Sequence, residues 1–133
     1  MATVIPFPTP SLGGFRLQEI VRGSGKGVIT VWLSSYGDAR ARFRIRVRHL
    51  RGTPRPWPKT QFRPLGKGVF EIKWKAGKKE FRALGFDRGD YFVMVIGCTH
   101  KQAVYDPHDC LNTANRRKSE VERGEWRIID FEP

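Results

Sequence analysis

The stretch from 64 to 86, PLGKGVFEIKWKAGKKEFRALGF, constrains the fold more than any other part of the chain, because it predicts two adjacent β-strands. Phe70, Ile72 and Trp74 alternate with charged residues, which is the pattern of a strand with one face against a core. The opposite face carries lysine, arginine and glutamate. We therefore expect a hairpin with one apolar and one charged face.

A two-residue turn at 76–77 is the connection that this hairpin predicts. Antiparallel pairing across that turn places Glu71 beside Arg82 and Lys73 beside Glu80. Two interpretations of the charged face remain open from the pattern alone. It is either the floor of a site for a phosphate-rich ligand, or a solvated surface with two cross-strand ion pairs.

The composition favours a polyanion as the ligand. The chain has 133 residues, of which 39% are hydrophobic and 12% aromatic, so one folded domain is expected. Lysine and arginine outnumber aspartate and glutamate 25 to 13, for a formal net charge of +12. Such a chain binds RNA, DNA or an acidic protein. No apolar run approaches the roughly 20 residues of a membrane span, and MATVIPFPTP does not resemble a signal peptide, so we expect a cytoplasmic protein without membrane contact.

The two cysteines raise the question of a metal site. Cys98 and His100, with His108 and Cys110, form a mirrored pair of Cys-x-His and His-x-Cys motifs that supplies the ligand types of a zinc site. Cys98, however, ends a strongly apolar strand, where a free cysteine behaves as a small hydrophobe. We therefore predict free thiols, no metal and no cofactor.

The remaining elements are predicted from periodicity and from turn residues. After a proline-rich leader (1–14), the patterns indicate a short strand at 15–21, a helix at 28–36 and a proline-rich linker at 52–59. They then indicate a buried strand at 91–98 and a final helix at 106–124. Residues 40–48 are ambiguous, because arginine alternates with apolar residues throughout. That alternation slightly favours a strand, but a helix is equally able to bury its apolar residues along one stripe.

This order of elements, with PLGKGVFEIKW, then KEFRALGF, then YFVMVIGCTHK, resembles the RelE/HigB superfamily of toxin-antitoxin toxins, and within it the phage-derived, HigB-like branch. The resemblance implies an α+β, RelE-like fold. It implies a twisted antiparallel sheet of three to five strands, with two N-terminal helices and one C-terminal helix packed on one side. It also implies a single domain over 1–133 and a helix, not a strand, at 38–51.

The resemblance further implies a function. Most toxins of this superfamily cleave messenger RNA on the ribosome without a metal, and a helix-turn-helix antitoxin protein neutralises them. The alternative is a non-catalytic binder of the same fold, such as a gyrase-poisoning toxin or a phage-derived inhibitor. RNA cleavage of this kind needs a base for the ribose 2′-hydroxyl, cations for the charged transition state and an acid for the leaving oxygen.

Candidate residues follow from the resemblance and from side-chain chemistry. Arg82 lies where the family has a phosphate-binding arginine, and a guanidinium matches phosphate oxygens in geometry and charge. His100 is the candidate acid or base. Lys101 is a candidate for charge neutralisation, and Tyr105 for base stacking or proton relay. The candidate RNA-binding residues are Lys73, Lys75, Arg116 and Arg117, with Lys73 also a candidate base. The general base is not identified by sequence alone.

Overall fold

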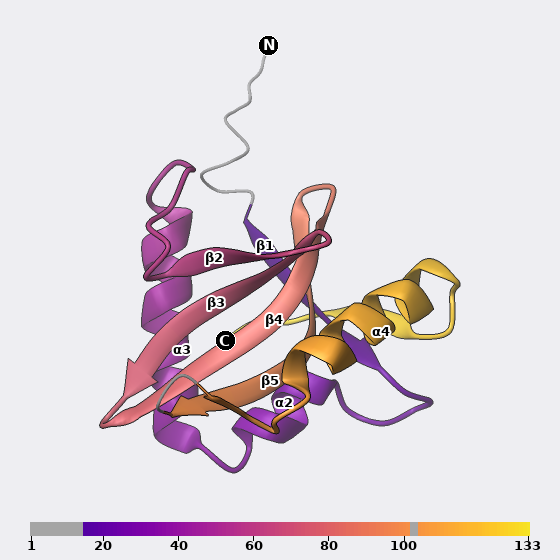
Figure 1. Cartoon of the computed structure of the whole chain (residues 1–133), viewed down its shortest axis with the longest axis horizontal. Coiled ribbons are helices and arrows are strands. Elements are labelled where there is room, and N and C mark those ends of the chain that lie inside the picture. The colour runs from indigo at the N-terminus through magenta and orange to yellow at the C-terminus, as the bar shows by residue number, and fades with distance from the viewer. Residues whose placement is uncertain (1–14, 102–103) are drawn as a thin grey trace.

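The computed structural model describes residues 15–101 and 104–133, and only the backbone of Lys101. The predicted leader (1–14) lies outside the described residues. The elements, drawn in Figure 1, are β1 (Arg16–Val21), α2 (Val28–Leu33), α3 (Gly37–Arg51), β2 (Phe62–Gly66), β3 (Val69–Ala76), β4 (Lys79–Arg88), β5 (Tyr91–Lys101), β6 (Val104–Asp106), α4 (Cys110–Glu122) and β7 (Arg127–Asp130). None of the helices in these ranges is long and apolar enough to cross a membrane.

The sheet differs from the predicted one. Seven strands of the described ranges form one mixed sheet in the order β2-β3-β4-β5-β1-β7, and β6 pairs with β5. β1 runs parallel to β5 and antiparallel to β7. The prediction of a RelE-like fold with an antiparallel sheet of three to five strands is therefore wrong. β1 buries Leu17 in one apolar layer and Ile20 in the other, and its two edges pair with β5 and β7, so it is an interior strand of the sheet.

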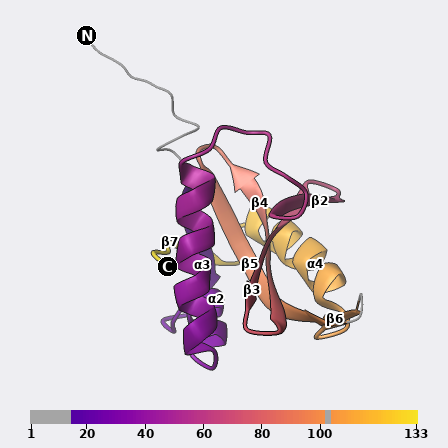
Figure 2. The same ribbon diagram turned by 90° about the vertical axis from the view of Figure 1, so that its left-hand side faces the viewer.

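Helices cover both faces of this sheet. Figure 2 shows α2 and α3 on one side and α4 on the other. The apolar layer under α2 and α3 includes Phe43, Trp74 and Phe92. The layer under α4 includes Leu84 and Ala114. The expectation that all helices pack on one side is thus also wrong, because the β-strands carry apolar residues on both faces and each face needs a cover.

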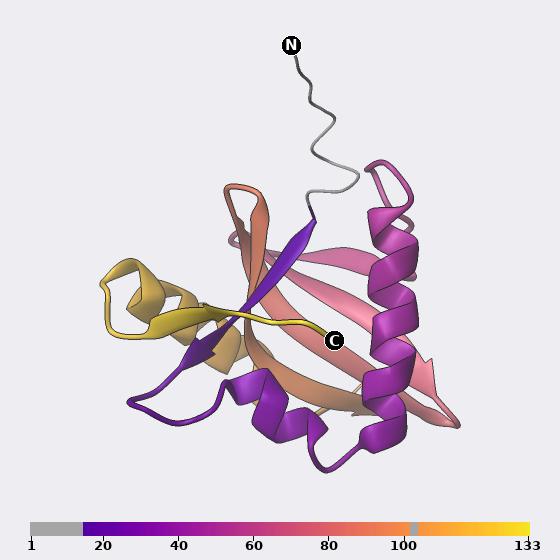
Figure 3. The same ribbon diagram turned by 180° about the vertical axis from the view of Figure 1, so that it is seen from behind.

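Helix α3 resolves the ambiguity of the alternating arginines. It buries an apolar stripe of Ala39, Phe43, Val47 and Leu50, as the helical interpretation expected. Several arginines are held by backbone carbonyls that lie far away in the sequence. Arg40 donates to the carbonyl of Glu132, and Arg44 to that of Pro133, so they tie the C-terminal tail to the helix (Figure 3). These arginines therefore have structural partners and are not a free basic surface.

The hairpin of β3 and β4 has a register that is shifted from the predicted one. Gly77 and Lys78 form the loop, and Gly77 has a φ of +63°, which the favoured two-residue turns require at that position. Lys73 therefore pairs with Arg82, and not with Glu80. Because the register changes by an even number of residues, each side chain stays on the predicted face.

Gly27 is required by a buried carboxylate. The Glu19 side chain is buried, and its Oε1 accepts hydrogen bonds from the amides of Ile29 at 2.8 Å and Thr30 at 2.9 Å, at the start of α2. A Cβ on Gly27 would lie 1.9 Å from the Glu19 carboxyl carbon.

We expect Gly27→Ala to lower the free energy of unfolding by about 2–3 kcal/mol, because it displaces a buried carboxylate from the amides of Ile29 and Thr30 and from the Thr30 hydroxyl. Thermal unfolding of the purified variant measures this. Gly25→Ala is the matched control, since its Cβ would meet one backbone oxygen at an ordinary 3.5 Å. Equal midpoints for the two variants would contradict the assignment.

Candidate functional site

Four polar side chains form a row across β3, β4, β5 and β6. The strand register pairs Lys75 with Glu80, Glu80 with His100, and His100 with Tyr105. Since directly paired residues share a face, the four side chains lie side by side on the face that α4 partly covers. Lys73 and Arg82 form the next row of the same face. The sheet thus brings together residues that are far apart in the sequence.

Arg82 is enclosed within this group. Its side chain is only 5% exposed, and it donates to Glu80 at 2.7 Å and to the carbonyl of Phe81 at 3.2 Å. Its Nε lies 3.4 Å from Glu71 Oε1. The predicted Glu71–Arg82 ion pair is therefore present, on a diagonal of the sheet. The resemblance suggested Arg82 as a direct phosphate ligand, but its guanidinium already contacts two carboxylates.

Glu71 is the buried centre of the cluster. Its side chain has no exposed surface, and it contacts Arg63 at 3.0 Å as well as Arg82. The hydroxyl of Tyr105 donates a short hydrogen bond to Glu71 Oε2. Burial, and then this bond, raise the pKa of Tyr105 above its usual value, so the phenol stays protonated at neutral pH. The hydroxyl of Tyr105 is thus committed to its hydrogen bond with Glu71, and Tyr105 is not placed to act as a base.

His100 has a defined partner for one ring nitrogen. Its Nδ1 lies 3.4 Å from Arg82 Nη2. Because a guanidinium only donates, Nδ1 must accept, which leaves the proton of the neutral ring on Nε2. Burial, and then the charge of Arg82, lower the pKa of His100 below its usual 6.5. At neutral pH, His100 therefore presents an Nε2–H donor to the site.

Lys73 and Glu80 carry the other perturbed charges. Burial lowers the pKa of Lys73, and the positive charges of Arg82 and Arg63 lower it further. The hydrogen bond from Arg82 lowers the pKa of Glu80, whose side chain is 38% exposed. The site thus holds an accessible ionised carboxylate beside an ammonium that releases its proton more easily than an ordinary lysine.

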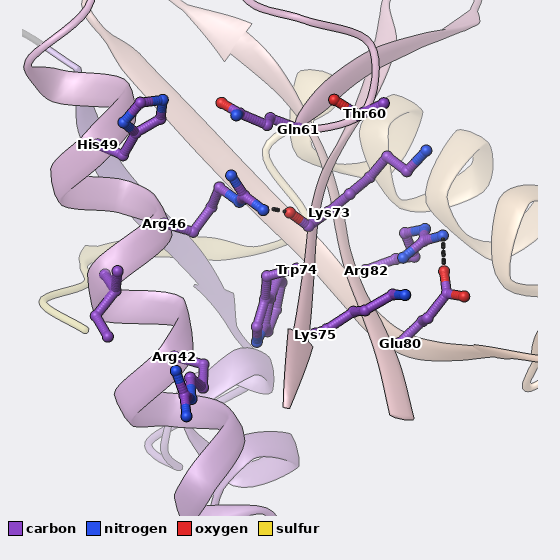
Figure 4. Close-up of a pocket in the computed structure, with 11 residues that line it drawn as sticks. Arg42, Arg46, His49, Thr60, Gln61, Lys73, Trp74, Lys75, Glu80 and Arg82 are labelled. Carbon is purple, nitrogen blue, oxygen red and sulfur yellow. Dashed lines mark hydrogen bonds and ion pairs between the residues drawn. The ribbon is translucent and has the colours of Figure 1, made fainter. Parts of the chain in front are cut away.

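A cavity of about 630 Å³ opens beside these rows, between α3 and the exposed edge of β3 (Figure 4). It is lined by Arg42, Ile45, Arg46, His49, Thr60, Gln61, Lys73, Trp74, Lys75, Glu80 and Arg82. Five of these are cationic and one is a carboxylate. Arg46 donates to the carbonyl of Lys73 at 2.8 Å, so it joins the helix to the edge of the sheet. The cavity is therefore strongly positive, which suits a polyanion.

Some of the site residues predicted from the sequence line the cavity, and others lie elsewhere. The predicted residues Lys73, Lys75 and Arg82 line the cavity, and His100 and Tyr105 adjoin them. The side chain of Lys101 lies outside the described residues. Figure 4 shows Arg42, Arg46 and His49 reaching the cavity from α3. These three were not predicted as site residues, although their spacing on a helix places them on one face.

The two arginines predicted on α4 do not line the cavity. Arg117 donates to the carbonyl of Val95 at 2.8 Å and lies over the ring of Trp126, so it fastens α4 to the sheet. Burial lowers its pKa. Arg116 is exposed and lies 3.8 Å from Glu120.

The cysteine–histidine set is not assembled as a zinc site. Cys98 and Cys110 are buried free thiols, and His108 is exposed. A hydrogen bond with Cys110, and then burial, raise the pKa of the Cys98 thiol, which disfavours the thiolate that zinc needs. Within residues 15–101 and 104–133, no three or more histidine, cysteine, aspartate or glutamate side chains are grouped to hold a metal.

Comparisons with protein-family models, with curated proteins and with solved structures gave no match for this chain. The chemistry of the site must therefore be argued from its own geometry. That geometry defines a positive cavity lined by the carboxylate of Glu80 and the ammonium of Lys73, with the imidazole of His100 on the strand next to Glu80.

Proposed function

We propose that this protein is a metal-independent endoribonuclease that cleaves messenger RNA in the cytoplasm, on the ribosome, as the toxin of a toxin-antitoxin pair. The observation that carries the proposal is the assembly of Lys73, Glu80 and His100 beside a strongly positive cavity. The sequence resemblance to RelE/HigB toxins, which spans about residues 15–124 and is most specific at 64–101, supports the biological role. It also supplies the expected partner, a helix-turn-helix antitoxin.

The chemistry needs one proton acceptor and one proton donor. Glu80 is ionised at neutral pH and takes the proton of a ribose 2′-hydroxyl, whose oxygen then attacks the adjacent phosphorus. Lys73, with its lowered pKa, gives a proton to the departing 5′-oxygen. The products are a 2′,3′-cyclic phosphate and a 5′-hydroxyl end. One proton is taken up and one is released, so the step is balanced.

Fixed donors stabilise the charge that develops on the phosphate. His100 donates its Nε2–H to a non-bridging oxygen, and Lys75 adds a positive charge from the exposed end of the row. Arg82 acts through its neighbours, because it holds Glu80 and sets the tautomer of His100. The sheet supplies these groups from neighbouring strands, which keeps their spacing rigid.

A second candidate function is non-catalytic binding of a polyanion, as in a gyrase-poisoning toxin. The observation that favours it is the enclosure of Arg82 by Glu71 and Glu80, which leaves the strongest predicted phosphate ligand without a free face. In that case the positive cavity binds nucleic acid or an acidic protein surface, and the row of polar residues is structural.

Expression of the protein without a cognate antitoxin is expected to arrest growth, because messenger RNA is cut. Primer extension on cellular transcripts should show new 5′ ends within codons. Cleavage in a purified translation system should persist when a chelator selective for zinc and other transition metals is added while the Mg²⁺ that the ribosomes need is kept, since no step uses a metal. Intact transcripts together with double-strand breaks in DNA would contradict the nuclease proposal and support the gyrase alternative.

A further inference from the structure

Gln61 has an unusual position in the cavity wall. Its side-chain oxygen Oε1 is buried, and it has no hydrogen-bond partner among the described residues. Four other buried side-chain atoms share this property, but all four belong to charged groups. Those of Glu71 and Arg82 face each other across an ion pair. Gln61 has no such compensation, and an unpaired buried acceptor lowers stability.

The backbone around Gln61 is held firmly. Its amide donates to the carbonyl of Pro58 at 2.9 Å, and its carbonyl accepts from the amide of Lys73 at 2.9 Å. Lys73 in turn accepts from Arg46 through its own carbonyl. The side chain of Gln61 is therefore presented from a rigid turn that is bonded directly to a proposed catalytic residue.

The surroundings of Gln61 include groups that can contact a nucleobase as well as cations that can contact a phosphate. Figure 4 shows its amide extending into the cavity from the turn toward α3, above Lys73. The cavity is also lined by the exposed side chains of His49 and Thr60, which can form hydrogen bonds, and of Ile45, which is 56% exposed and apolar. Arg46 and Lys73 lie just below Gln61 and supply positive charge for an adjacent phosphate (Figure 4). Bases in single-stranded RNA are read by such hydrogen-bonding edges and stacked on flat or apolar side chains.

We propose that Gln61 contacts a nucleobase next to the scissile phosphate and sets the base preference of cleavage. The inference rests on the proposed function and adds a specificity-determining residue to it. The Gln61 amide offers an acceptor beside a donor, and bases present such pairs in complementary order on their edges. Oε1 is buried in the free protein, so a bound base supplies its missing donor once the Gln61 side chain turns further toward the cavity.

The test uses short 2′-O-methyl homopolymers of each of the four bases, which cannot be cleaved at a blocked 2′-oxygen. An abasic oligomer of the same length reports phosphate binding alone. Affinity is measured by fluorescence anisotropy at low salt. Gln61→Leu is expected to weaken binding of the preferred homopolymer about tenfold, as for loss of a bidentate base contact, without changing the affinity for the abasic oligomer.

Gln61→Glu gives an independent prediction. A carboxylate only accepts, and guanine presents two adjacent donors on its Watson–Crick edge, so the ratio of guanine to adenine affinity should rise even if the added negative charge weakens both. Gln18→Leu is the matched control. Gln18 lies on β1 and donates to Asp130, away from the cavity, so its removal should leave every ratio unchanged.

The thermal midpoint of Gln61→Leu shows whether a change in binding comes from a loss of folding. Because Oε1 is unpaired in the free protein, Gln61→Leu should keep or raise the thermal midpoint. If the wild type binds the base-bearing and abasic oligomers equally, or if both Gln61 variants keep its base ratios, the inference is overturned while phosphate binding and the nuclease proposal stand. If the wild type binds none of the oligomers, the inference is overturned, while primer extension on cellular transcripts still decides the proposed function.

Discussion

Arg82→Ala is expected to lower the free energy of unfolding by about 3–5 kcal/mol, the cost of breaking a buried ion pair from one side. For a chain of this size, that corresponds to a fall of about 10–20 °C in the thermal midpoint. The reason is that Glu71 is fully buried and, among the described residues, would keep only Arg63 as an ion-pair partner. Thermal and chemical unfolding of the purified variant measure the effect.

Two further variants separate the buried pair from general surface charge. Arg116→Ala removes an exposed arginine that lies 3.8 Å from Glu120, and it should change the unfolding free energy by about 0.5 kcal/mol or less. The double variant Glu71→Gln/Arg82→Met should be less destabilised than the sum of its single changes, because no buried charge is then left without its partner. An Arg82→Ala protein as stable as Arg116→Ala would show that the cluster contributes nothing to folding.

The expected loss of stability means that the toxicity of Arg82→Ala does not by itself test the catalytic mechanism. If Arg82→Ala abolishes growth arrest, the loss reports an unstable protein as much as a missing catalytic group. The residues that separate the two explanations are Glu80 and His100, because both are partly exposed and neither carries the buried charge of the cluster. The mechanism must therefore be tested at those positions.

The hairpin shows what sequence alone can predict. Alternation along β3 correctly assigned each side chain to a face, which is why Lys73 and Arg82 were expected together. The register was wrong because residues 76–77 and 77–78 both qualify as the loop, and the positive φ of Gly77 selects the second. The central position of Glu71 was missed for a related reason. Its partners Arg63 and Tyr105 come from β2 and β6, whose pairing is not encoded by any local pattern.

The error in the sheet has a different origin. β1 was predicted as a strand, but its parallel pairing joins Arg16 to Tyr91 and Leu17 to Phe92, residues that lie far apart in the chain. The apolar residues on both faces of β1, such as Leu17 and Ile20, are the one feature of its sequence that indicates an interior strand. Residues 40–48 were likewise ambiguous from their periodicity, although the resemblance implied a helix at 38–51, as the structure has it. The carbonyls that hold Arg40, Arg44 and Arg46 belong to the C-terminal tail and to Lys73, and no local pattern indicates them.

Glu80→Gln is expected to reduce the RNA cleavage rate by about 100-fold or more, because a neutral amide cannot take the 2′-hydroxyl proton. The amide keeps an oxygen that accepts from Arg82, so folding and RNA binding should be preserved. Single-turnover cleavage of a ribosome-bound message measures the rate. Glu125→Gln, at an exposed glutamate beside Arg123, is the control and should cleave at the wild-type rate.

The pH dependence of this rate gives a separate check on the same assignment. Glu80 must be ionised and its hydrogen bond with Arg82 lowers its pKa from 4.5, so the acid limb of the profile should lie below pH 4.5. Lys73 must be protonated and its pKa is lowered from 10.5, so the basic limb should lie below pH 10.5. Lys73→Arg, whose guanidinium keeps its proton, should remove the basic limb and slow the reaction. A basic limb that is unchanged in Lys73→Arg would exclude Lys73 as the acid, and a Glu80→Gln protein with full activity would exclude the proposed base.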